Sequence, residues 1–184
     1  MRYLTCLFFI SLFLISCDDD LPVFDNTLQL DGNNATAPIL DPGEYETAAY
    51  FSASIMADKA DRQLREIEFY LYTPPTSLEV IVYGEGSVTR PGSELYSATI
   101  TSGLREGRWN THVLPERLTL DGNPIWISVK FNANGSDQII GCDAGPKENG
   151  GDQLFSSNDG GWTTFQAISG ESINWNVRGD LVPE

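Results

Sequence analysis

Residues 67–72 read IEFYLY, residues 73–77 read TPPTS and residues 78–83 read LEVIVY. In both six-residue runs, apolar side chains recur at every second position, which is the pattern of a half-buried β-strand. The two prolines between the runs cannot donate to a strand ladder, so they favour a turn rather than one long strand. This stretch therefore predicts two neighbouring strands and an all-β fold.

The chain from residue 44 on repeats this pattern. Residues 56–64 are the only stretch that fits a helical turn. Because the apolar runs are short and are separated by Gly, Pro and Asn/Asp turns, the sequence predicts one antiparallel β-sandwich domain over residues 44–184. The further predicted strands are 48–55, 95–101, 109–114, 117–120, 125–132, 138–142, 153–156, 163–168 and 173–178.

The composition excludes several classes of protein. The chain has 184 residues, a length typical of about one domain, with 26 acidic and 11 basic side chains and a net charge of −15 at pH 7. This charge argues against binding to nucleic acid or to acidic membrane surfaces, because phosphate groups require excess Lys and Arg. With 41% hydrophobic and 20% charged residues, the chain is not intrinsically disordered.

The N-terminus has the pattern of an export signal. Residues 4–15 are mainly apolar, follow the basic Arg2 and are too few to span a membrane. Residues 14–17 read LISC, which resembles the lipobox of bacterial lipoproteins. The resemblance implies a signal peptide over residues 1–16, acylation of Cys17 and an anchor in the outer membrane. An ordinary signal peptide with an incidental Cys, or a buried apolar segment, is the alternative.

The residues after Cys17 bear on where the anchored protein faces. Residues 18–20 are all Asp, which resembles the surface-export signal of Bacteroidota lipoproteins and implies exposure on the cell surface. In enterobacterial lipoproteins an Asp here would instead imply retention at the inner membrane. Residues 17–43 are rich in Pro, Gly, Asn and Asp, so we expect the acylated Cys and a flexible tether, with residues 28–30 as a candidate edge strand.

A series of segments from residue 67 on resembles a β-sandwich module of Bacteroidota surface adhesins and secreted peptidases. This module occurs beside fibronectin type III and gingipain-type adhesin modules. The resemblance implies a jelly-roll-like sandwich with a non-catalytic adhesive role, and it implies no particular site residues. The segments that carry it are 67–72, 78–83, 91–92, 95–96, 109–110, 118–122, 125–127, 141–146 (GCDAGP), 159–163 and 174–178.

The residues for common catalytic chemistry are scarce. His112 is the single histidine, no Gly-x-Ser-x-Gly elbow is present, and nothing selects a catalytic pair among the carboxylates. We therefore expect no enzyme activity. If Cys17 is acylated and Cys6 leaves with the signal peptide, Cys142 has no partner in the chain. We interpret Cys142 as a small buried group, with intermolecular pairing as the alternative.

Calcium is the one metal for which the sequence offers ligands. The ion prefers carboxylate and carbonyl oxygens, and four suitable side chains lie in Gly-rich loops. Asp and Gly also suit turns that hold no metal, so this alternative stays open. The candidate ligands are Asp143, Asp152, Asn158 and Asp159.

Aromatic side chains give the most specific binding hypothesis. Strand alternation places Tyr70, Tyr72, Tyr83 and Trp126 on the faces opposite the main apolar sets. Such rings can stack on sugars or anchor a protein partner at a small entropic cost. The alternative is that cross-strand aromatic pairs stabilise the sheet or that these rings lie beneath a loop.

Together these patterns predict a lipid-anchored, adhesin-like module at the cell surface. Its expected partners are the membrane, through the lipid, and an extracellular glycan or protein, but not nucleic acid. A structural subunit of an outer-membrane or surface assembly is the alternative function, and an extracellular hydrolase is the least favoured.

Overall fold

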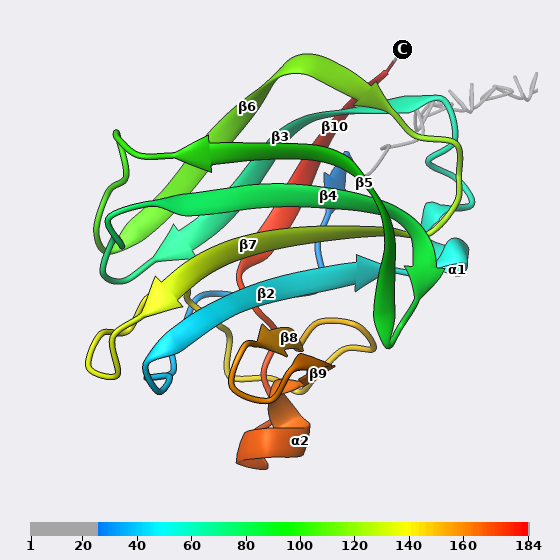
Figure 1. Ribbon diagram of the computed structural model, residues 1–184. Helices are drawn as coiled ribbons and strands as arrows, with labels where there is room; N and C mark the ends of the chain where they lie inside the picture. The colour runs from blue at the N-terminus through cyan, green and yellow to red at the C-terminus, as the bar shows by residue number, and fades with distance from the viewer. Residues whose placement is uncertain (1–25, 184) are drawn as a thin grey trace, which may run out of the picture.

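The computed structural model describes residues 26–183, and in these residues two antiparallel sheets pack face to face (Figure 1). The predicted all-β antiparallel sandwich is therefore confirmed. The first sheet has the order β1 (Thr27–Leu28), β10 (Val177–Pro183), β3 (Arg62–Leu71), β6 (Arg108–Thr119). The second has the order β5 (Arg90–Ile100), β4 (Leu78–Ser87), β7 (Ile125–Ala133), β2 (Gly43–Phe51), β8 (Gln153–Ser156), β9 (Gly161–Thr164).

The connections between the strands make the sandwich a jelly roll. The sheet order β1-β10-β3-β6 lies against the order β2-β7-β4-β5, so the chain crosses between the sheets as it proceeds. This is the eight-stranded arrangement of two Greek keys, in which β10 is the eighth strand. The β8–β9 hairpin is inserted before β10 and extends the second sheet beyond β2. The jelly-roll expectation is thus confirmed.

The stretch over residues 67–83 behaves as its pattern predicts. Ile67, Phe69 and Leu71 of β3 point inward, as do the alternate apolar residues of β4, and each is buried in the core between the sheets. Residues 73–77 connect the two strands, which lie in different sheets. The inward-facing apolar residues of β3 and β4 therefore contribute to the same core from the two sheets.

Several predicted elements differ in the structure. Residues 109–114 and 117–120 belong to one strand, β6, because Pro115 falls within an irregularity opposite Arg65, where no ladder hydrogen bond is needed. Residues 138–142 form only isolated bridges to neighbouring segments. Of the predicted helical turn at residues 56–64, only Met56 is helical, at the end of α1 (Ala53–Met56).

The predicted strand at residues 163–168 is wrong in its second half. β9 ends at Thr164, and α2 (Phe165–Ser169) begins there. The Thr164 hydroxyl accepts a hydrogen bond from the Ala167 N–H at 3.2 Å and so caps the helix. Gly170, at a φ of 79°, ends it. The capping pattern overrides the alternation of apolar residues here.

The segment predicted as a flexible tether is part of the fold from residue 27 on. β1 pairs with β10, and Thr36 and Ile39 form bridges to residues 142 and 138. Asp31, only 5% exposed, forms a bidentate ion pair with Arg178, whose Nε and Nη2 both lie 2.9 Å from its carboxylate. The predicted domain boundary at residue 44 is therefore too late. Residues 17–25 lie outside the described part of the chain.

We predict that Asp31→Ala lowers the free energy of unfolding by about 3 kcal/mol, because it leaves the Arg178 guanidinium without its carboxylate in a largely buried site. Urea denaturation measures this change. Asp41→Ala, at an exposed position in the same segment, is the control and should change stability by less than about 0.5 kcal/mol. An equally small effect of Asp31→Ala would contradict the role of the ion pair.

Candidate functional site

The four predicted aromatic residues lie on two different faces of the sandwich. Tyr70 is on the outer face of the four-stranded sheet, and Tyr72 follows at the end of the same strand, β3. Tyr83 and Trp126 pair directly across β4 and β7, in the six-stranded sheet. The structure therefore does not bring the four together, because the outer faces of the two sheets point away from each other.

The interpretation of Trp126 as a solvent-facing ring is wrong. Its side chain is 0% exposed, and the rings of Tyr50 and Trp162 lie 5.4 and 5.0 Å from it. Val88, in the turn between β4 and β5, packs on the same cluster. Alternation assigned Trp126 to the outer face, but it gave no sign that the β8–β9 hairpin and this turn cover that face.

Tyr83 is half-buried in a polar cluster on the same face. It forms a hydrogen bond with Glu46, and the Ser128 hydroxyl donates to Glu46 Oε1 at 2.5 Å. Burial raises the pKa of Tyr83 well above its ordinary value, and the charge of Glu46 adds to this effect. Burial also raises the pKa of Glu46, against the opposing hydrogen bonds from Ser128 and Tyr83. The Tyr83 hydroxyl therefore stays protonated, and its hydrogen bond to Glu46 holds it within this cluster.

Tyr70 and Tyr72 form an aromatic surface together with Trp109, the partner of Tyr70 across β3 and β6. The Tyr70 ring lies 5.5 Å from that of Tyr72 and 5.9 Å, edge-on, from that of Trp109. The Tyr70 hydroxyl donates to the Gly107 carbonyl at 2.6 Å, and the Tyr72 hydroxyl donates to the Ala35 carbonyl at 3.2 Å. All three rings are half-buried, so they combine open area with fixed positions.

Trp109 is a functional candidate that the sequence reasoning missed. The Arg178 guanidinium lies 4.0 Å from the centre of its ring, in a cation–π contact. The signal was present in the alternation of β6, where Asn110 and Leu114 are buried while Trp109 and Val113 face outward. The aromatic surface, defined as Tyr70, Tyr72 and Trp109, is therefore fixed in place by Arg178 and, through it, by Asp31.

A cleft of about 330 Å³ adjoins Trp109 at the open edge between β5 and β6. The β5–β6 loop forms one wall, and the Asn110 amide holds this loop by accepting from Arg105 N at 2.8 Å and donating to the Arg105 carbonyl at 3.0 Å. His112 lies in the cleft, and its Nε2 is 2.6 Å from the Tyr96 hydroxyl. This bond joins the two sheets, so His112 has a structural partner.

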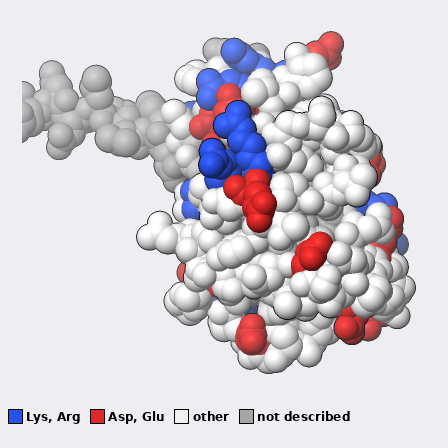
Figure 2. Space-filling view, turned by 90° about the vertical axis from the view of Figure 1, so that its left-hand side faces the viewer, with Lys and Arg blue, Asp and Glu red and all other residues white. Residues whose placement is uncertain are grey.

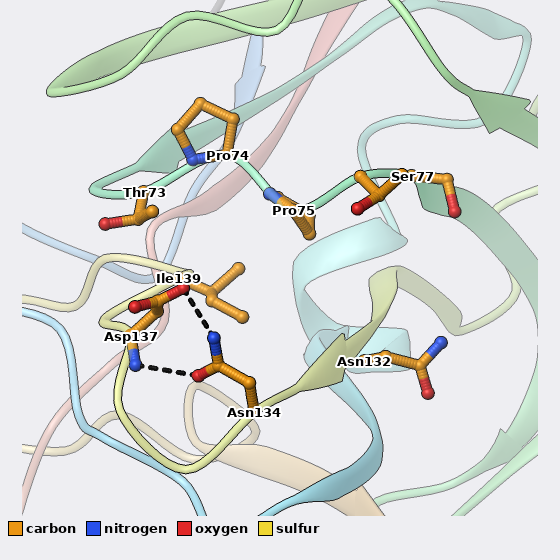
Figure 3. A pocket seen from close by; sticks show the side chains of 9 residues that line it. Thr73, Pro74, Pro75, Ser77, Asn132, Asn134, Asp137 and Ile139 are labelled. Atoms are coloured by element: carbon orange, nitrogen blue, oxygen red, sulfur yellow. Dashed lines mark hydrogen bonds between the residues drawn. The ribbon is translucent and has the colours of Figure 1, made fainter.

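A second, more polar pocket of about 320 Å³ lies between the β3–β4 loop and the loop after β7 (Figure 3). Pro74 and Pro75 form one wall, and Asn132, Asn134 and Asp137 line the other. Asn134 Nδ2 donates to Asp137 Oδ2 at 2.7 Å, and the Asp137 N–H donates back to Asn134 Oδ1. Asn134 and Asp137 therefore satisfy part of each other's hydrogen-bonding capacity.

Both hollows open near the end of the sandwich where the β3–β4 and β5–β6 loops lie, on the left in Figure 1. Figure 2 views this end directly and shows basic side chains gathered near its top beside a few acidic ones. The rest of this end carries few charges. Among the basic side chains of the β5–β6 region are the exposed Arg105 and Arg108. This end therefore carries charges of both signs, and the exposed Glu106 lies between these two arginines in the sequence.

The structure does not support the predicted calcium site. Both Asp143 carboxylate oxygens are occupied, because they accept from the N–H groups of Gly32, Gly145 and Asn174, each at 2.8 Å, and from the Asn174 amide. Burial acts to raise the pKa of Asp143, but these hydrogen bonds outweigh it and the pKa is lowered. Asp143 therefore fixes three loop segments through these hydrogen bonds.

Two of the other three candidate ligands also have structural partners. Asp152 is buried 3.4 Å from the Lys147 ammonium, and its Oδ2 accepts from the Gln166 N–H at the start of α2. Asn158 donates to the Pro42 carbonyl and to the Tyr45 hydroxyl. Asp159 is exposed. Within residues 26–183, no three His, Cys, Asp or Glu side chains are grouped so that they could hold a metal ion.

Cys142 is a buried free thiol, as interpreted, and burial raises its pKa to about 12, with a further contribution from Asp143. Its backbone forms bridges to Thr36 and Trp175, so the residue lies inside the fold. Cys17 and the whole lipobox lie outside the described residues. None of the helices in residues 26–183 is long and apolar enough to cross a membrane.

No protein-family model matches the sequence, and no curated protein matches it. Solved structures with a similar fold include the clostridial cysteine protease Cwp84 after propeptide cleavage, with a TM-score of 0.60 and 12% identity over 86% of this chain and 40% of that one. Another is the structure of the cysteine protease and lectin-like domains of Cwp84, a surface layer associated protein of Clostridium difficile. Its TM-score is 0.54, with 11% identity over 77% of this chain and 33% of that one. This chain thus spans well under half of those chains, and the likeness shows the fold alone.

We predict that His112 titrates below its ordinary pKa of 6.5, because burial between the sheets disfavours the charged ring. The folded state then binds fewer protons than the unfolded state, so the stability that His112 contributes is complete above pH 6.5 and is lost as the pH falls through 6.5 toward the lowered value. Because the chain has one histidine, a single ring signal in an NMR titration measures its pKa. A pKa at or above 6.5 would contradict the described environment.

Proposed function

We propose that the protein is a non-catalytic, adhesin-like module that is anchored by lipid at Cys17 and binds an extracellular glycan or protein through the aromatic surface. The observation that carries this proposal is the set of three half-buried rings, Tyr70, Tyr72 and Trp109, whose positions are fixed by hydrogen bonds and by Arg178. Rings that are already ordered can stack on a sugar ring or accept an apolar side chain at a small entropic cost.

The position of the surface on the sandwich supports the proposal. At the N-terminal end of the described chain, Asn26 contacts Arg62 at the start of β3 and accepts from the Leu181 N–H. Tyr70 and Tyr72 lie at the other end of β3, which at about 3.3 Å per residue is roughly 30 Å away. A lipid at Cys17 would hold the first end near the membrane, so the aromatic surface would face outward.

Two further observations agree with a binding role. The fold resembles that of a surface-layer-associated protein that includes a lectin-like domain, and a jelly roll presents broad sheet faces on which ligands can bind. The only histidine is hydrogen-bonded to Tyr96, and this contact joins the two sheets, which is a structural role. These observations support a surface lectin or adhesin in preference to a hydrolase.

A glycan array tests the proposal with protein that begins at residue 18, which retains every described residue. We predict binding that Trp109→Ala weakens by about thirtyfold, or about 2 kcal/mol, because the largest ring of the surface is lost. Since Asp143, Asp152 and Asn158 are already partnered, we expect the same binding in calcium and in chelator.

Phe155→Ala is the matched control, because it removes a half-buried ring that contacts Trp162 on the other sheet. It should leave binding within about twofold of the original protein. If the folded protein binds no glycan, the test is repeated with extracellular proteins of the same habitat. Absence of any ligand in both tests, or equal loss in Phe155→Ala and Trp109→Ala, would overturn the proposal.

A further inference from the structure

A groove of about 540 Å³ lies between residues 38–41 and the region of α2, and none of the three rings of the aromatic surface lines it. It is the largest of the cavities described above. Ile39 is 59% exposed and Ile168 is 50% exposed, and both line it. They are two of the four large apolar side chains that are exposed in residues 26–183, and they share one groove, as contiguous apolar surface at a binding site does.

Carboxylates accompany the apolar walls of this groove. Asp41, Asp159 and Glu171 line it, and no Lys or Arg does. All three are exposed, and in the described part of the chain none of them forms an ion pair. Other acidic side chains of the protein are neutralised locally, as Glu44 is by Lys130 at 3.1 Å. The groove therefore combines an aliphatic lining with an uncompensated negative charge.

The walls of the groove are fixed before any partner arrives. Ile39 forms a β-bridge to Gln138, whose side-chain amide donates to the Ala37 carbonyl at 2.5 Å. On the opposite side, Asn158 Nδ2 donates to the Pro42 carbonyl at 3.2 Å and to the Tyr45 hydroxyl at 3.3 Å. Because these segments are already ordered, a partner would bind without a large loss of their conformational entropy.

We propose that this groove binds a polypeptide segment that presents an apolar side chain flanked by Lys or Arg. The apolar side chain would bury Ile39 and Ile168, and the flanking cations would meet the three carboxylates, which are the complementary charges. A sugar is a poorer match, because the rings that line the groove, Tyr45 and Phe165, are each only 5% exposed. A second copy of this chain, with its net charge of −15, would be repelled.

Three short synthetic peptides test the proposal against protein that begins at residue 18. The first has a central leucine pair flanked by lysines, the second has the same leucines flanked by glutamates, and the third has serines flanked by lysines. Methyl NMR of Ile39 and Ile168 reports where each peptide binds. We expect the first peptide to shift both methyl signals and to bind about tenfold more tightly than either of the others.

Variants of the groove complete the test. Ile168→Ser and the pair Asp41→Asn with Glu171→Gln should each weaken binding of the first peptide by about fivefold or more, and added salt should weaken it further. Val113→Ser, which replaces another exposed apolar residue on β6, is the matched control and should not change binding.

Each other outcome overturns the proposal. Equal binding of the leucine–lysine and leucine–glutamate peptides would show an apolar patch without charge selection. Equal binding of the two lysine peptides would show only general attraction to an acidic protein. If neither methyl signal shifts, the groove does not bind the peptide. If the signals shift with protein concentration in the absence of peptide, the groove is a site of self-association. Because the aromatic surface lies elsewhere, none of these results depends on the proposed glycan binding.

Discussion

The interaction on which the fold and the candidate site both depend is the one made by Arg178. Its guanidinium forms a bidentate ion pair with the buried Asp31 and also lies 4.0 Å from the ring centre of Trp109. The first contact fixes the N-terminal segment against β10, and the second supports the aromatic surface from below. Because both charges are largely removed from water, neither partner can be lost without leaving the other in an unfavourable environment.

The jelly-roll connections explain why Arg178 can contact both Asp31 and Trp109. β10 lies between β1 and β3, and β3 in turn pairs with β6, so a side chain on the outer face of β10 lies near both the N-terminal segment and the β6 edge. A second polar contact works in the same way. Asp143 holds Gly32, Gly145 and Asn174 through four hydrogen bonds and so joins the N-terminal segment to the two segments that precede β8 and β10.

Much of the fold could be predicted from the sequence, because strand alternation is a local property. The pattern of residues 67–83 assigned the inward face of β3 and β4 correctly, and turn residues marked most strand ends. The same local pattern could not show that the β8–β9 hairpin covers Trp126, nor that a cap at Thr164 starts a helix. It also suggested a tether for residues 27–43, because bridges and a buried ion pair between residues far apart in sequence leave no periodic signal. Of the candidate site, Tyr70 and Tyr72 were identified, whereas Trp109 emerged only from its pairing across β6.

The central claim is that the N-terminal segment belongs to the fold and, through Asp31 and Arg178, determines the position of the aromatic surface. Hydrogen exchange of the backbone amides of Gly32, Ala35 and Thr36 tests this most directly, since each donates a hydrogen bond to residue 142 or 143. We predict exchange at least about a hundredfold slower than in an unfolded peptide. Exchange at the rate of an unfolded peptide would show that the segment is a free tether, and it would contradict the account.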